Sequence, residues 1–321
     1  MSLLRHRLFL RITVPLALAA LVAAGGRRVF DAVVAGVQQG AMIALVALGY
    51  TMVYGILKLI NFAHSEVFMM AAFFGFFLTK GFGVDASPIF AGVAGTLSAM
   101  VLAGVLGVLV EKIAYAPLRA RSRGKSNSNT RITPLVTALG MSVLLQNLAQ
   151  LLFTTQYRTY PEILPIGRAR TIVFVVAVVV MVLLQVLVYG TWFGKAMRAV
   201  SVNMEAARLM GIRTSRIIAL TFVTGSALAA AGAVLFCLSQ SQVYPTMGVV
   251  IGTRSFVAAV IGGIGSIPGA MLGGFLIGVI GELTKLTPYS GLQDVIIFAV
   301  LIAVLLVRPT GLLGKAGIEK V

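Results

Sequence analysis

The sequence predicts an all-α integral membrane protein, a polytopic bundle of about eight transmembrane helices with one further Gly-rich element that is broken or re-entrant. The first reason is composition, because 59% of the 321 residues are hydrophobic and only 11% are charged. Soluble domains carry about 25% charged residues. A core surrounded by water could not hide so much apolar surface, so most side chains must be solvated by lipid.

The second reason is the spacing of the apolar runs, many of which are long enough to cross about 30 Å of hydrocarbon. They cover residues 8–24, 31–56, 65–79, 88–110, 133–153, 171–189, 215–238 and 294–307. The region 253–283 is too rich in Gly, and too interrupted by Pro268, to form one simple span. We expect it to be a helical pair whose bend is covered by protein rather than lipid.

The charges between the spans predict the orientation, because Lys- and Arg-rich connections stay in the cytoplasm. The cytoplasmic set consists of the N-terminal region, residues 112–131, residues 195–216, the C-terminal region and Lys58. This assignment places 18 of the 26 basic residues inside. Both termini are then cytoplasmic, and 253–283 begins and ends outside. The net charge of +17 belongs to these loops, and no basic patch with interleaved aromatic residues predicts a nucleic-acid surface.

The chain divides into an N-terminal segment, residues 1–30, and a main domain, residues 31–321, that contains a cytoplasmic loop at 194–216. The N-terminal segment has a basic start, a short apolar stretch and the small residues Ala23-Ala24-Gly25. These features fit a retained first transmembrane helix or a cleaved signal peptide.

Enzymatic and metal-binding classes find little support in the sequence. A single Cys and two His residues cannot build a disulfide framework or a metal cluster. Glu66, Glu282 and Asp294 are scattered, and no nucleophile stands beside a base. We therefore expect no catalytic residues, no cofactor and no metal. A channel or a secondary transporter, working without an ATPase, remains an alternative.

The stretch KLINFAHSEVFMM (58–70) places Asn61, His64, Ser65 and Glu66 between two apolar segments. In one interpretation they restart a helix, with Ser65 or Asn61 accepting a hydrogen bond from a free backbone N–H and Glu66 in the favourable first turn. In the other, they line or gate a solute pathway at a discontinuous helix.

The loop 194–213 has apolar residues at spacings of three and four, which predicts one short amphipathic helix that ends at Gly211. Such a helix lies on the lipid surface or docks into a groove of a partner. Within it, Glu205-Ala206-Ala207 are followed by three residues and then Gly211.

The third stretch, residues 260–278, holds Gly262, Gly263, Gly265 and Ser266 before Pro268. No Lys follows these glycines and no strand precedes them, so they do not form a nucleotide-binding loop. A break in a membrane helix fits better, with Pro near the start of the next helix. The later glycines, at 269, 273, 274 and 278, form a small-residue face for close helix packing. The broken element serves packing alone or also contributes to a pathway.

Three segments together resemble the LivH-type permease of branched-chain amino-acid ABC importers. They are GYTMVYGILKLINFAHSEVFMMAAF (49–73), GKAMRAVSVNMEAARLMGI (194–212) and AAVIGGIGSIPGAMLGG (258–274). The resemblance covers residues 31–315, including the closing RPTGLLG at 308–314. The Gly-rich stretch also resembles, more loosely, sugar permeases of the ribose type and urea or amide permeases, which stay open as alternatives.

The resemblance implies a non-catalytic transport subunit in the bacterial inner membrane. Its partners would be a second permease, two cytoplasmic ATPase subunits and a periplasmic solute-binding protein that delivers the amino acid. The motif resembles the coupling loop of such permeases, so the expected ATPase contact consists of Glu205, Ala206, Ala207, Arg208 and Gly211. The expected pathway or gate residues are Asn61, His64, Ser65, Glu66, Gly262, Gly263, Gly265 and Ser266.

Overall fold

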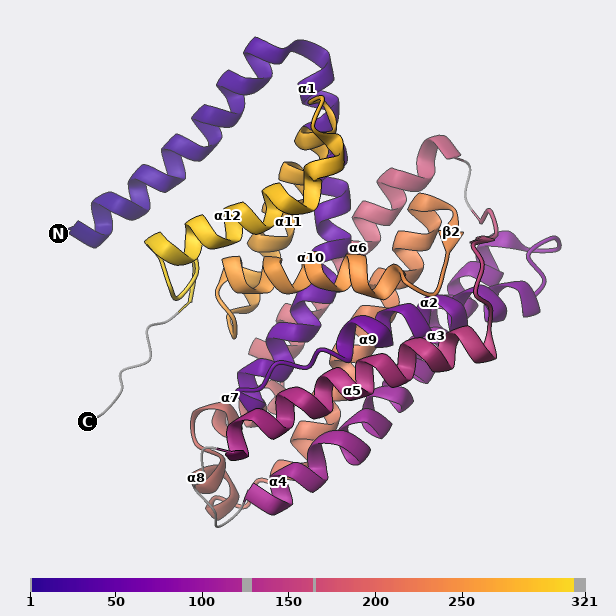
Figure 1. Cartoon of the computed structure of the whole chain (residues 1–321), viewed down its shortest axis with the longest axis vertical. Coiled ribbons are helices and arrows are strands. Elements are labelled where there is room, and N and C mark those ends of the chain that lie inside the picture. The colour runs from indigo at the N-terminus through magenta and orange to yellow at the C-terminus, as the bar shows by residue number, and fades with distance from the viewer. Residues whose placement is uncertain (1, 123–128, 164–165, 315–321) are drawn as a thin grey trace.

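The computed structural model describes residues 2–122, 129–163 and 166–314, and these form a bundle of helices (Figure 1). The helices are α1 (Ser2–Leu57), α2 (His64–Gly81), α3 (Pro88–Val110), α4 (Ala116–Ser122), α5 (Asn129–Leu152), α6 (Ile166–Gly190), α7 (Trp192–Val202), α8 (Met204–Leu209), α9 (Thr214–Gln240), α10 (Met247–Gly262), α11 (Ile267–Lys285) and α12 (Gln293–Val307). A π-helical turn (Glu111–Tyr115) joins α3 to α4, and a 3-10 turn (Ser290–Leu292) precedes α12. The short strands β1 (Arg158–Thr159) and β2 (Gln242–Val243) pair antiparallel.

Seven helical segments in the described part of the chain are long and apolar enough to cross a membrane. They are Gly26–Leu57, Pro88–Arg119, Thr133–Leu152, Arg170–Gly190, Thr214–Gln240, Ile267–Lys285 and Ser290–Val307. The predicted polytopic helical bundle is therefore confirmed. The predicted span 65–79 lies in α2, which is not among the seven and is buried along most of its length. The side chains of the predicted span 8–24 lie outside those that the structure describes.

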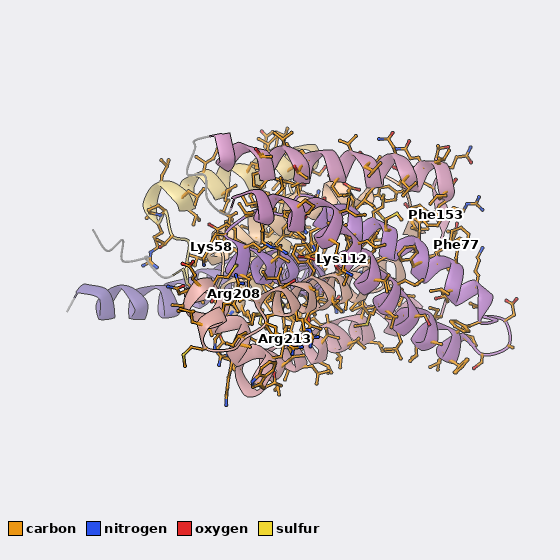
Figure 2. All side chains as sticks on the ribbon, turned by 90° about the horizontal axis from the view of Figure 1, so that it is seen from below. Lys58, Phe77, Lys112, Phe153, Arg208 and Arg213 are labelled. Atoms are coloured by element: carbon orange, nitrogen blue, oxygen red, sulfur yellow. The ribbon has the colours of Figure 1, made fainter. Side chains whose placement is uncertain are left out.

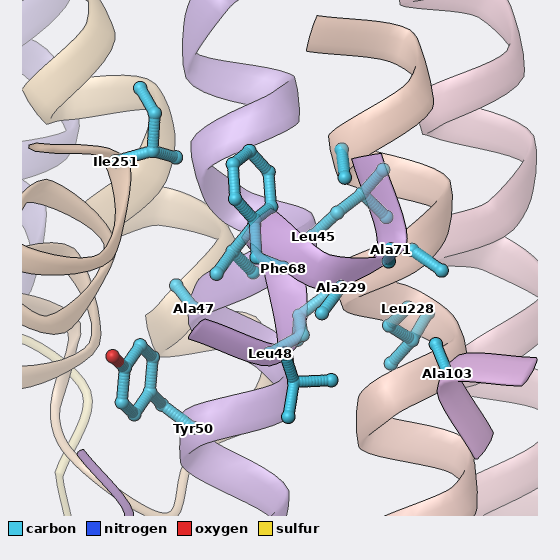
Figure 3. Close-up of a cluster of buried hydrophobic side chains, with 14 of the residues drawn as sticks. Leu45, Ala47, Leu48, Tyr50, Phe68, Ala71, Ala103, Leu228, Ala229 and Ile251 are labelled. Carbon is cyan, nitrogen blue, oxygen red and sulfur yellow. The ribbon is translucent and has the colours of Figure 1, made fainter. Parts of the chain in front are cut away.

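The first helix has a bend and a long central part. Gly26 has φ 61° and ψ −156°, which interrupts α1. Beyond this bend, the most apolar window of α1 is 83% buried, whereas the corresponding window of Ser290–Val307 is 11% buried. Side chains from α1, α2, α3, α9 and α10 meet around this central part (Figure 3). α1 is thus the centre of the core, and the last helix is peripheral.

The α11 helix runs antiparallel to α1 at very close range. A Cβ atom on Gly36 would lie 2.6 Å from the Cα of Val279, and one on Gly40 would lie 2.7 Å from the Cα of Phe275. A Cβ on Gly274 would lie 2.6 Å from the Cα of Ala44. The predicted small-residue face on the second half of the Gly-rich region is therefore confirmed, because only glycine permits this approach.

The Gly-rich region is broken where the sequence predicts. α10 crosses α1 at a steep angle (Figure 1) and ends at Gly262, and α11 begins at Ile267 with Pro268 in its first turn. Gly263 and Gly265 have φ values of 104° and 95°, which side chains other than glycine rarely adopt. The Ser266 hydroxyl accepts a hydrogen bond from the Gly269 N–H at 3.2 Å.

The bend between α10 and α11 is covered by the C-terminal segment 308–314. The N–H groups of Leu312 and Leu313 donate to the carbonyls of Ile261 and Gly262, at 2.8 and 2.9 Å. A Cβ on Gly263 would lie 2.3 Å from the backbone N of Gly314. These bonds satisfy carbonyls that the end of a helix leaves free. The expectation that protein shelters this bend is confirmed.

Candidate functional site

The polar residues between α1 and α2 are buried in the core. Asn61 is 3% exposed, His64 2%, Ser65 8% and Glu66 1%. They are buried because α2 begins beside the interior of α1 rather than beyond its end. The His64 ring packs edge-on against Tyr50, with centroids 4.8 Å apart, and a Cβ on Gly49 would lie 2.2 Å from His64 Nε2. Two turns of α1 therefore extend past the start of α2.

The predicted capping of α2 by Ser65 or Asn61 is wrong. The N-cap position is Ala63, and no side chain accepts a hydrogen bond there. The Ser65 hydroxyl instead donates to the Phe62 carbonyl at 2.8 Å, and Asn61 Oδ1 accepts from the Tyr115 hydroxyl at 2.9 Å. Both side chains have other partners inside the bundle. The placement of Glu66 in the first turn is as predicted.

Glu66 lies between α2, α5 and α10. Its Oε1 accepts a long hydrogen bond from the Ser142 hydroxyl at 3.4 Å and lies 3.5 Å from the Ser65 hydroxyl oxygen, whose hydrogen goes to Phe62. Its Oε2 has no partner among the described residues, and a Cβ on Gly248 would lie 2.8 Å from it. Burying a carboxyl without full hydrogen bonding destabilises a protein, and ionisable groups inside membrane proteins usually have a function.

Three further residues belong to this region and were not predicted from the sequence, namely Glu111, Tyr115 and Arg119. The Ala116 N–H donates to the Glu111 carbonyl five residues back, so the helix is wider here. Tyr115 is thereby directed towards Asn61, and Glu111, 3% exposed, forms an ion pair with Arg119. Pro117 was the available signal, because its ring nitrogen cannot donate to the carbonyl of Ile113 and disturbs the preceding turn.

Removing the Tyr115 hydroxyl tests the importance of its hydrogen bond. We expect Tyr115→Phe to lower the free energy of unfolding by about 1 kcal/mol, because the buried Asn61 oxygen loses its donor. Unfolding by SDS in mixed micelles would measure this change. The matched control is Tyr289→Phe, since Tyr289 is 64% exposed. Equal stability of Tyr115→Phe and wild type would contradict the prediction.

The start of α2 and the break at 262–266 do not meet each other; they lie at opposite ends of α10. The first half of α10 covers the start of α2, since a Cβ on Gly252 would lie 2.2 Å from the Ser65 Cβ. The glycines at 262, 263 and 265, with Ser266, lie at the other end of α10 against the C-terminal segment. α10 therefore connects the two sets of predicted pathway residues mechanically.

The loop after α6 contains two helices instead of the one amphipathic helix predicted from its apolar spacing. Asn203 is extended, with φ −152° and ψ 108°, and separates α7 from α8. Its Oδ1 accepts hydrogen bonds from the N–H groups of Glu205 and Ala206, both at 3.0 Å. The single-helix prediction is wrong because apolar spacing does not register a side chain that caps a new helix.

Gly211 ends α8 as predicted. Its φ is 83°, its N–H donates to the Arg208 carbonyl at 3.1 Å, and the Ile212 N–H donates to the Ala207 carbonyl at 3.0 Å. These two bonds form a Schellman motif, in which glycine supplies the left-handed residue. The end of α8 is thereby fixed by backbone bonds alone.

Most of the E-A-A-x3-G motif faces outwards. Glu205, Ala206, Arg208 and Gly211 are exposed, whereas Ala207 is buried against the body. Three large apolar side chains beside them are also exposed, Val202 at 87%, Leu209 at 86% and Met210 at 82%. Figure 2 shows Lys58, Arg208 and Arg213 towards the same end of the bundle, with Phe77 and Phe153 towards the other. We call the end that carries Lys58, Arg208 and Arg213 the basic end.

Helices that are interrupted in the core, together with a projecting helix at one end, are features of a membrane transport subunit. A family model described as "Branched-chain amino acid transport system / permease component" matches residues 32–305. The chain belongs to this family, and the resemblance noted in its sequence is confirmed.

Individual relatives agree with this family. The chain is 39% identical to the high-affinity branched-chain amino acid transport system permease protein BraD of Pseudomonas aeruginosa, over 89% of this chain and 96% of the relative. It is 37% identical to the corresponding LivH protein of Salmonella typhimurium over the same shares. The galactofuranose transporter permease protein YtfT of Escherichia coli is 25% identical, over 80% of this chain and 70% of that protein. No solved structure matches the chain.

Proposed function

We propose that this protein is a permease subunit of an ABC importer and that it forms, with a second permease, the pathway for branched-chain amino acids. A periplasmic binding protein delivers the solute, and two cytoplasmic ATPase subunits hydrolyse ATP. The chain itself has no enzymatic activity and needs no cofactor. It resides in the bacterial inner membrane, with the basic end and both termini in the cytoplasm.

The observation that carries this proposal is the exposed α8. Large apolar side chains that cluster on an exposed surface beside charged ones mark a contact with a partner or with a membrane surface. Glu205, Arg208 and Gly211 lie in the same exposed turn as Leu209 and Met210. A short helix of this kind suits a cleft in a partner protein. We assign the ATPase contact to this turn, together with Ala206 and Ala207.

The pathway part of the proposal rests on the discontinuous helices. α2 starts inside the core with Asn61, His64, Ser65 and Glu66 near its first turn, and α10 lies across that start. Alternating access requires an element with two arrangements that its partners can favour differently. α10, packed on α2 at one end and broken at 262–266 at the other, is that element.

Solute uptake by whole cells tests the proposed function. Cells that lack this gene should lose the uptake of labelled leucine and keep that of ribose and urea, and the wild-type gene should restore it. Loss of ribose or urea uptake with leucine uptake intact would transfer the proposal to a sugar or amide permease. If all three activities survive, the proposed substrate is wrong.

A further inference from the structure

A cavity of about 140 Å³ lies at the end of the bundle opposite the basic end. Four helices line the cavity, and each contributes the end that lies farther from α8. They are the start of the buried part of α1, the start of α6, the end of α9 and the end of α11. The cavity is polar, and its polar side chains are Gln38, Gln39, Arg170, Gln240, Glu282 and Lys285, with Ser239.

The charges in the cavity are of both signs. Glu282 forms an ion pair with Lys285 on the same helix. Arg170, on a different helix, has no carboxylate partner among the residues that the structure describes. An unpaired guanidinium prefers a planar carboxylate, which it binds with two parallel hydrogen bonds. Glu282 can accept from an ammonium group in addition to Lys285, because a carboxylate has four acceptor positions.

The same cavity has apolar walls as well. Ala35, Met42 and Val173 contribute to its lining, and Met42 and Val173 are buried. Met adapts its shape to different aliphatic groups. The combination of a guanidinium, a carboxylate and a small apolar surface matches a zwitterion with a hydrocarbon side chain. A sugar or urea carries no charge and would form no ion pair with the Arg170 guanidinium.

Close helix packing shuts the cavity on its inner side. Beyond Met42, a Cβ on Gly232 of α9 would lie 3.2 Å from Val46 Cγ2 and 3.4 Å from the Leu45 Cβ. Leu45 and Val46 are fully buried. About eleven residues of α1, or roughly 16 Å at 1.5 Å per residue, separate Gln39 from Tyr50 and its neighbour His64. A solute in the cavity would therefore be separated from the start of α2 by closed packing between α1 and α9.

We infer that this cavity is the first binding site of the transported amino acid within the permease, with Arg170 binding its carboxylate and Glu282 its ammonium group. Met42 and Val173 contact the aliphatic side chain. The inference rests on the proposed function, and it adds a substrate site that the solute occupies after it leaves the binding protein.

The test uses the complete transporter in proteoliposomes, with leucine as the solute and the binding protein supplied outside. Arg170→Gln and Glu282→Gln should each lower the initial rate of leucine transport by about tenfold, the effect of losing one charge-assisted hydrogen-bonded contact. ATP hydrolysis stimulated by the leucine-loaded binding protein should remain. Arg170→Lys keeps the charge without the fork and should transport at an intermediate rate. Arg27→Gln, an exposed residue outside the cavity lining, is the charge-matched control.

The outcomes distinguish failure of the substrate site from failure of the proposed function. Transport lost with stimulated hydrolysis retained supports the substrate site. Equal loss of transport and stimulated hydrolysis would overturn it and make this end a docking surface for the binding protein. Wild-type transport in both Gln variants would overturn it as well, while leaving the proposed function intact. A wild-type complex that fails to transport leucine would overturn both proposals.

Discussion

Replacement of Gly211 by proline is expected to abolish leucine uptake while the protein remains inserted in the membrane. Proline fixes φ near −65° and has no N–H. Gly211 has φ 83° and donates its N–H to the Arg208 carbonyl. The substitution therefore removes the Schellman motif and changes the direction of the chain after α8. Among the described residues, no atom beyond the chain neighbours lies within 4 Å of a Cβ at this position, so the rest of the bundle should fold.

The chain offers a closely matched control for this substitution. Gly83 has φ 77°, and its N–H donates to the Lys80 carbonyl at 3.2 Å, but it lies between α2 and α3, away from the basic end. Gly83→Pro should impose the same local cost and leave ATPase binding unchanged. Gly211→Asn should retain part of the activity, since Asn tolerates the left-handed region better than other residues. Uptake, the amount of protein in the membrane and co-purification with the ATPase subunits measure the effect, and normal uptake by Gly211→Pro would exclude α8 as the coupling element.

The positions of the helices could be predicted from the sequence because lipid imposes a length on each apolar run. The break at 262–266 was also predictable, since clustered glycines and Pro268 leave few regular alternatives there. The length of a run does not indicate its depth in the bundle, however. The run 65–79 resembles a span but lies in α2, which begins inside the core.

The interior contacts of the candidate site were less accessible to sequence analysis. The bond from Tyr115 to Asn61 joins residues 54 positions apart, and it depends on a local widening of the helix. Asn203 alone splits the predicted amphipathic helix through two hydrogen bonds of its side chain. Arg170 of α6 and Glu282 of α11 line one cavity only because α1 and α9 are packed beside them. Tertiary contacts of this kind leave no periodic pattern in the sequence.

The two glycine-rich contacts of α10 are held by different interactions. At its far end, the glycines of the break meet the C-terminal segment through backbone hydrogen bonds. At its near end, Gly248 and Gly252 meet the first turn of α2 through close backbone packing. A contact made by packing can slide at lower cost than one made by backbone hydrogen bonds, because it leaves no polar group unpaired. We therefore expect a pathway to open at the α2–α10 contact.

Blocking this contact is expected to have the second large effect. In Gly252→Leu, the new Cβ would lie 2.2 Å from the Ser65 Cβ and 3.1 Å from the Ser65 Cα. The conflict involves atoms at or next to the backbone, so no rotamer relieves it, and α10 must move away from α2. We expect leucine uptake to fall by more than tenfold, with a loss of stability of about 1–3 kcal/mol from overpacking.

Two further variants separate the packing of this contact from general damage. Gly140→Leu is the control, because Gly140 lies in a helix and a Cβ there would meet no atom of the described residues within 4 Å beyond its own helix. Gly252→Ala should reduce uptake less than Gly252→Leu, and adding Ser65→Gly should restore part of it by removing the Cβ that the new methyl group meets. Such recovery is a coupling between two residues in contact, which independent defects would not produce. If Ser65→Gly brings no recovery, or if Gly252→Leu transports leucine normally, the contact between α2 and α10 has no part in opening the pathway.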